Sequence, residues 1–168
     1  YFNDMEYCLE FALENRKAMI EKIIEGMEQQ LNRSIERGIF INRNHNHAEV
    51  KGEYIIHRKG ATHAEKGMYG VIPANMKDGS FIVKGKGSEL SLNSSSHGAG
   101  RVLSRKDAKD TLDVAEFHNT MLGVVTNHTD ETLDESPKAY KNIFEVMELQ
   151  KDLVEIIDRS IPILNIKG

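Results

Sequence analysis

Apolar residues recur at helical spacing from Asp4 to about Leu31, which predicts an amphipathic helix at the start of the chain. Asn3 is followed three residues later by Glu6, the pattern of a capped helix N-terminus. The apolar positions include methionine, leucine and isoleucine, which are among the residues most often buried in proteins. We therefore expect this stripe to belong to the hydrophobic core.

The pattern changes from about Phe40 to short β-branched and aromatic runs bounded by glycines. These runs predict strands at 53–60, 67–73 and 79–85. Helical spacing returns near 113–122 and over 142–157, and a strand-like segment closes the chain at 160–168. The fold class that follows is α+β, a sheet of short strands flanked by helices, with residues 1–168 forming one domain.

Composition narrows the class of protein further. The 168 residues are 39% hydrophobic and 29% charged, which is typical of a globular chain, and no apolar run is long enough to span a membrane. The single cysteine, Cys8, excludes an internal disulfide and a cysteine zinc cluster, so we expect an intracellular, cytoplasmic protein without a membrane partner. Because the chain opens at Tyr1 without a signal peptide, we expect it to be a piece of a longer protein.

Charge is unevenly distributed along the chain. The formal net charge is −4, yet the segment from Lys51 to Lys109 holds 11 Lys or Arg against 5 Asp or Glu. This basic segment contains a Gly/Ser-rich stretch. A phosphate-binding site is therefore compatible with the acidic balance of the whole chain.

The segment from Gly85 to Arg101 surrounds one histidine, His97, with small residues. Small residues let a large ligand approach the backbone, whose N–H groups can bind anionic oxygens. His97 could then be a metal ligand, an acid or base, or a nucleophile toward phosphorus, and the alternative is a turn-rich loop with an exposed histidine. If a helix opens at Arg101, then Arg101 and Arg105 lie one turn apart and present two guanidiniums to the same side.

A second candidate lies between Asn42 and Glu49. His45 and His47 are two residues apart, so in an extended chain both face the same side and could share a metal ion. Equally, one of them binds while the other faces solvent, or the segment is an ordinary surface loop.

Several motifs, taken in order, resemble the C-terminal half of the RtcB family of GTP-dependent RNA-splicing ligases. They are INRNHNHAEV, HRKGATHAEKGMYGVIPANM, GSFIVKGKG, NSSSHGAGR with a following LSR, LDESPKAYKNI and the terminal KG. The resemblance covers essentially the whole chain, including the opening helix, and implies that any missing part is N-terminal. Long motifs in register are far more specific than one short glycine pattern.

The resemblance implies a role for each matching residue. His97 matches the nucleophile that attacks the α-phosphorus of GTP and becomes a histidine–GMP phosphoramidate, and His45 matches a manganese ligand. A 2′,3′-cyclic phosphate end is first opened to a 3′-phosphate. The GMP then passes from the histidine to the RNA 3′-phosphate, and the 5′-hydroxyl of the second RNA displaces the GMP. The remaining matches are nucleotide-pocket positions at Ser80, Ala99, Gly100, Tyr140 and Lys167, with Lys167 at the guanine, and positions on the RNA phosphate path at Arg101 and Arg105.

The sequence also departs from the family pattern. The usual Gly-Ser after the proline is Ala74-Asn75 here, so the nucleotide contact falls to Asn75. His47 stands where the family has another residue type, and neither it nor His57 is expected to be a metal ligand. The family's metal site takes a cysteine, an aspartate and further histidines from its N-terminal half, and Cys8 does not match that cysteine.

The partners implied are RNA with 3′-phosphate and 5′-hydroxyl ends, the N-terminal half of the same enzyme and an archease-type activator. The alternative from another functional class is a non-catalytic, truncated homologue that binds nucleotide, RNA ends or a partner chain.

Overall fold

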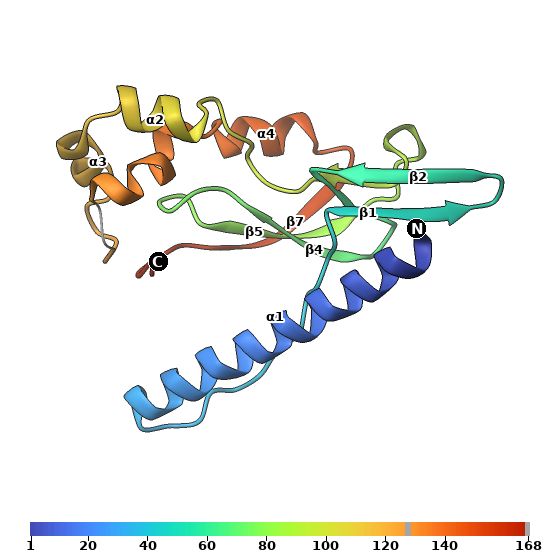
Figure 1. The fold of residues 1–168 in the computed structure, drawn as a ribbon, viewed down its shortest axis with the longest axis horizontal. Helices are drawn as coiled ribbons and strands as arrows, with labels where there is room; N and C mark the ends of the chain where they lie inside the picture. Colours follow the sequence, from blue (N-terminus) through green and yellow to red (C-terminus); the bar gives the residue numbers. More distant parts are fainter. Residues whose placement is uncertain (127–128, 167–168) are drawn as a thin grey trace.

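Three small antiparallel sheets lie at the centre of the protein in a computed structural model that describes residues 1–126 and 129–166. β1 pairs with β2, β3 pairs with β6, and the third sheet has the order β4–β5–β7 (Figure 1). The strands are β1 (Asn46–Lys51), β2 (Tyr54–Lys59), β3 (Ala61–His63), β4 (Tyr69–Pro73), β5 (Ser80–Gly85), β6 (Ser94–Ser96) and β7 (Val154–Ser160). The helices are α1 (Phe2–Leu31), α2 (Arg105–Thr111), α3 (Val114–Thr120) and α4 (Ile143–Leu149), with 3-10 turns at Glu89–Ser91, Asp130–Glu135 and Pro137–Ala139. The α+β class expected from the sequence is confirmed.

The core lies between the β4–β5–β7 sheet and α4, which covers one face of it (Figure 1). Alternate residues of β5 are buried, as the period of two in a strand requires, so Phe81 and Val83 point to the same side. Ile143 and Met147, one turn apart on α4, pack into the same cluster. Ala99, two residues after His97, is also part of this core, so the His97 loop is attached to a packed sheet.

A second, smaller cluster packs α3 against the turn that leads out of β4. Phe117 and Met121 are almost fully buried with Met76 and Leu133. Asp113 caps α3 by accepting a hydrogen bond from the backbone N–H of Glu116 at 2.8 Å. The predicted helix near 113–122 is confirmed.

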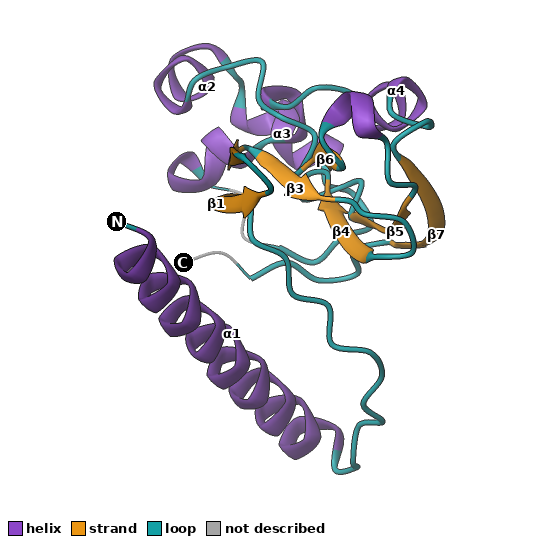
Figure 2. Cartoon of the chain, turned by 90° about the vertical axis from the view of Figure 1, so that its right-hand side faces the viewer, coloured by secondary structure: helices purple, strands orange, loops and turns teal. Residues whose placement is uncertain are grey.

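Helix α1 occupies the predicted segment but not the predicted environment. It extends away from the sheets (Figures 1 and 2) and contains no buried residue. Met19, Ile23 and Leu31 of the apolar stripe are 62%, 58% and 49% exposed. The expectation that this stripe belongs to the core is wrong, because among the described residues too little of the chain covers it.

Two further predictions are corrected at element ends. Tyr1 is the N-cap of α1 and no side chain caps the helix, so the proposed Asn3 and Glu6 cap is wrong. The helix expected over 142–157 ends at Leu149, because Val154 and the residues after it pair with β5 instead. The β-branched residues there suit a strand better than a helix.

The strand expected over 160–168 is also wrong over the residues described. β7 ends at Ser160, and beyond it a single bridge joins Leu164 to Val125. For residues 42–49, the sequence left an ordinary surface loop as one alternative. In the structure, β1 begins inside this segment, at Asn46. No helix in the described ranges combines the length and the apolar character needed to cross a membrane.

Candidate active site

A cavity of about 700 Å³ opens between the turn after β4, the loop after β6 and the segment that follows β7. Most of the nucleotide-pocket positions named from the sequence line it, although they come from segments far apart in the chain. The lining includes Asn75, Ser80, His97, Ala99, Gly100, Arg101 and Tyr140. The fold therefore gathers these residues around one space of a size typical for small ligands.

The wall of this cavity at Asn75 is a tight turn held by its own side chain. Asn75 Oδ1 accepts hydrogen bonds from the backbone N–H groups of Lys77 and Asp78, both at 2.9 Å, and Nδ2 donates to Asp78 Oδ2 at 2.8 Å. Gly79 closes the turn with φ +83°, and a Cβ there would lie 2.0 Å from the carbonyl oxygen of Ser160. The amide of Asn75 is thus used mainly to shape the wall.

His97 directly follows β6, whose last residue Ser96 is paired with Ala61 of β3. This pairing brings the ring of His97 next to Gly60, and its Nδ1 lies 2.6 Å from the Gly60 carbonyl oxygen. A carbonyl oxygen can only accept a hydrogen bond, so Nδ1 carries the proton and Nε2 keeps its lone pair when the ring is neutral. Among the described residues, the imidazole is therefore oriented with Nε2 available to act on a ligand.

A second cavity, of about 320 Å³, lies on the other side of His97 and is lined by His45 and Arg16. The rings of His45 and His97 are stacked, with centroids 5.2 Å apart. Burial lowers the pKa of His45 below its usual value, and the charges of His97 and Arg16 lower it further. A lowered pKa keeps this imidazole neutral, which is the form that binds a metal ion.

Arg16 is a residue of this site that the sequence analysis did not consider. It reaches from α1 to the loop before β1, where its Nε donates to Asn42 Oδ1 at 2.7 Å and its Nη2 to Asn44 Oδ1 at 3.4 Å. The side chain thus fixes the loop that carries His45 and brings a positive charge to the second cavity. Nothing in the local pattern around Arg16 points to this contact, which joins residues 26 apart in the chain.

Arg101 and Tyr140 form the far wall of the larger cavity. The Arg101 guanidinium stacks over the Tyr140 ring at 4.9 Å, and its Nη1 donates to the Tyr140 hydroxyl at 3.0 Å. Tyr140 in turn donates to Glu135 Oε2 at 2.7 Å. Burial raises the pKa of Tyr140, and the bond to Glu135 raises it further, while Arg101 acts in the opposite direction. The phenol therefore stays protonated as a hydrogen-bond donor.

Arg101 and Arg105 do not lie one turn apart on a helix, so that expectation is wrong. Helix α2 begins only at Arg105, because Ser104 caps it by accepting from the N–H of Asp107 at 3.0 Å. The two guanidiniums nevertheless meet at Glu135, at 3.8 Å from Arg101 and 3.7 Å from Arg105. Arg105 is 77% exposed and so remains accessible from solvent. Lys167 lies outside the described residues.

His45 by itself supplies one ligand atom to a metal ion at the second cavity. Cys8, the single cysteine of the chain, is an exposed residue of α1. One neutral imidazole next to His97 fits as part of a manganese site whose other ligands come from elsewhere. His47, which was not expected to bind metal, lies with Glu49 and His63 in a separate group.

The family of this chain is shown by comparison with known proteins. The family model described as tRNA-splicing ligase RtcB matches residues 1–168. This chain belongs to the RtcB family. The RNA-splicing ligase RtcB of Escherichia coli K12 is 38% identical to it over an alignment of 181 residues. The alignment covers the whole chain and 44% of that relative.

A tRNA-splicing ligase RtcB from Nanoarchaeum equitans is 33% identical and also matches the whole chain, over 42% of its own length. The chain therefore spans less than half the length of these RtcB relatives. The resemblance stated from the sequence motifs is confirmed, and the RtcB relatives are named as ligases of RNA.

Proposed function

We propose that this chain, together with the N-terminal half of an RtcB enzyme, forms an RNA ligase. It would join an RNA 3′-phosphate or 2′,3′-cyclic phosphate end to a 5′-hydroxyl end through a histidine–GMP intermediate made from GTP. The observation that carries the proposal is the position of His97 between two cavities, with Nδ1 bound to the Gly60 carbonyl and Nε2 free. The names of the relatives support the same class of reaction.

His97 Nε2 would attack the α-phosphorus of GTP, forming a P–N bond as the bond to the leaving pyrophosphate breaks. The Gly60 carbonyl would stabilise the resulting positive charge on the ring through Nδ1–H. An oxygen of the RNA 3′-phosphate would then take the GMP from His97, which restores the imidazole. Finally, the 5′-hydroxyl of the second RNA would attack the activated 3′-phosphate and release GMP, leaving a phosphodiester.

The guanylate would occupy the larger cavity. Its walls at Ala99 and Gly100 have little or no side chain, which lets a ribose approach the backbone. Ser80 and the Tyr140 hydroxyl would contribute polar contacts, and Asn75 would act chiefly through the shape of its turn. We assign Lys167 to the guanine on the resemblance alone.

His45 would supply one ligand of the Mn²⁺ site, and the N-terminal half would supply the others. When bound, a divalent ion neutralises the negative charge that develops on the phosphoryl group. Arg16 adds a fixed positive charge beside the same cavity. The lowered pKa of His45 supports its role as a ligand, because the ring does not need to lose a proton near neutral pH.

Arg105 would contact the RNA phosphate backbone, because its guanidinium is exposed at the edge of the larger cavity's wall. Arg101 is held by the carbonyl oxygens of Leu103 and Asp134 in addition to Tyr140. We therefore assign Arg101 chiefly to holding Tyr140 in place, with any phosphate contact secondary.

The N-terminal half would cover the exposed apolar side of α1. The relatives are more than twice as long as the matched part, so a further half exists in them. An apolar hollow lined by Ile20, Ile24, Phe40 and Ile41 lies between α1 and the segment that returns from it. We also propose a cytoplasmic location and an archease-type activator, both on the resemblance alone.

The test is incubation of the full-length protein with α-labelled GTP and Mn²⁺, followed by isolation of the protein. We expect an acid-labile, alkali-stable protein–GMP adduct that is absent in His97→Ala and retained in His57→Ala, with both variants folded. Adduct formation by His97→Ala at the wild-type level would remove the nucleophile assignment. Absence of any adduct in the full-length protein, with nucleotide or RNA ends still bound, would favour the non-catalytic alternative.

A further inference from the structure

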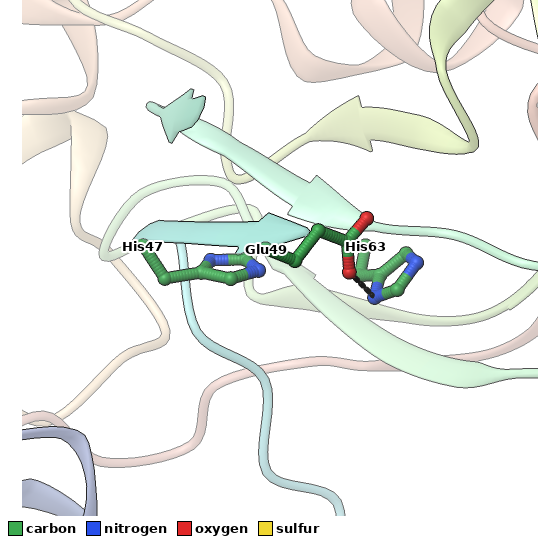
Figure 3. A group of neighbouring side chains, drawn as sticks. All are labelled: His47, Glu49 and His63. Atoms are coloured by element: carbon green, nitrogen blue, oxygen red, sulfur yellow. Dashed lines mark ion pairs between the residues drawn. The ribbon is translucent and has the colours of Figure 1, made fainter. Parts of the chain in front are cut away.

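A second group of metal-ligating side chains lies outside both cavities, and Figure 3 shows its members, His47, Glu49 and His63. Each offers one ligand atom, and these atoms all lie within 4.8 Å of one another. His47 and Glu49 are two residues apart on β1 and so share one face of that strand. His63 comes from β3, which belongs to another sheet, so the group is assembled only by the fold.

The distances within the group fit a single bound ion. Glu49 Oε2 lies 3.7 Å from His63 Nδ1. Two ligands held at about 2.0–2.2 Å from a tetrahedral metal ion are themselves roughly 3.3 Å apart. Only a small movement of the side chains is therefore needed to place both atoms on one ion.

The surrounding residues hold the ligands as outer partners do in metal sites. His63 Nε2 lies 3.3 Å from Glu65 Oε1, in an ion-pair contact that is not a hydrogen bond, so a negative charge lies next to this imidazole. Arg58 Nη1 lies 2.9 Å from Glu49 Oε1, which leaves Oε2 of that carboxylate for an ion. The Arg58 side chain is only 1% exposed.

Arg58 is itself fixed from two sides. Its Nε donates to Ser94 Oγ and its Nη2 to the carbonyl oxygen of Leu92, both at 2.9 Å. The carboxylate of Glu49 is therefore held by a rigid, buried neighbour. Preorganised ligands lose little conformational freedom when an ion binds.

His47 provides an independent indication that a partner is required. Its Nδ1 is buried and has no hydrogen-bond partner among the described residues. A buried polar atom without a partner is unfavourable, and native proteins rarely leave one in place. An ion between the three side chains is a partner of the right chemistry for an imidazole nitrogen.

We propose that His47, Glu49 and His63 bind a divalent transition-metal ion of the zinc class. Two imidazoles and one carboxylate form a ligand set that Zn²⁺ uses when water completes its coordination. Bound there, the ion joins β1, which follows His45 directly, to β3, which pairs with the strand leading into His97. This inference does not depend on the proposed ligase reaction.

The experiment measures zinc bound by the full-length protein after removal of metal with a chelator. Wild type is compared with Glu49→Gln and His63→Ala, and with His57→Ala as a matched control, because His57 is an exposed histidine on β2. We expect wild type and His57→Ala to bind one equivalent more than the other two. We also expect added Zn²⁺ to raise Tm in wild type and His57→Ala by more than in the two site variants.

A His45→Ala variant separates this site from the one proposed for catalysis. It should keep the zinc equivalent assigned here, whether or not it forms the GMP adduct. The inference is overturned if Glu49→Gln and His63→Ala bind as much zinc as wild type. It is also overturned if His45→Ala loses all of the zinc that wild type binds. Should one variant fail to fold without metal, His47→Gln takes its place in the same comparison.

Discussion

The rings of His45 and His97 lie almost parallel, 6° apart in orientation, although 52 positions separate them in the sequence. His45 is carried on the loop before β1, and His97 follows β6. Their stacking places the proposed metal ligand, His45, against the face of the proposed nucleophile, His97. Each of the two histidines therefore has consequences that can be tested separately.

His45→Ala in the full-length protein should slow formation of the GMP adduct at least roughly tenfold and raise the Mn²⁺ concentration needed, because a metal ligand is lost. His47→Ala should slow the adduct much less, since its ring lies in the other group. Adduct formation is measured across a Mn²⁺ titration. Equal effects of the two substitutions would contradict a separate role for His45.

Gly60→Ala should disturb His97 through the backbone. Gly60 has φ +67°, and a Cβ there would lie 3.4 Å from His97 Cε1. Gly52→Ala is the matched control, because Gly52 has φ +63° with nothing within 4 Å of its Cβ position.

Both glycine substitutions should lower the free energy of unfolding by about 1 kcal/mol, since alanine is strained at a left-handed backbone conformation. Only Gly60→Ala should also slow the adduct, because its carbonyl orients His97. Denaturant unfolding and adduct rates are the two measurements. A wild-type adduct rate in Gly60→Ala would contradict the orienting role.

Tyr140 should titrate above the ordinary tyrosine range, because burial and Glu135 both raise its pKa. Glu135→Gln should lower that pKa, since it removes a negative charge that disfavours the phenolate. Arg101→Gln should raise it further, since the guanidinium favours the phenolate. Tyrosine-selective ¹³C NMR across alkaline pH measures both shifts, and two shifts of the same sign would contradict this arrangement of charges.

Arg105→Ala should leave the GMP adduct unchanged but weaken RNA joining and reduce its salt dependence, as the loss of one phosphate contact does. Lys106→Ala, a charge loss at the neighbouring position of α2, is the control. Adduct formation and joining are measured separately at two salt concentrations. If the two variants join RNA equally well, the assignment of an RNA phosphate contact to Arg105 is contradicted.

The local pattern predicted most elements but not their ends or their burial. Periods of two and 3.6 residues identified α1, α3, β2, β4 and β5, because these periods follow from backbone geometry. The segment from Val154 was predicted as helix, since apolar spacing alone does not reveal that β5 offers it a partner strand. The apolar stripe of α1 was assigned to the core, although burial depends on what else packs against the helix.

The sequence by itself determined the α+β class, the family and the candidate residues His45, His97, Arg101 and Tyr140, because motifs and periodicity are local properties of a chain. Only the tertiary structure decided that Gly60 fixes the tautomer of His97, that Arg16 reaches the His45 loop, and that His63 joins His47 and Glu49. Those contacts join different strands or a helix and a distant loop. Sequence spacing carries no information about such distances, which are set by the pairing and packing of whole elements.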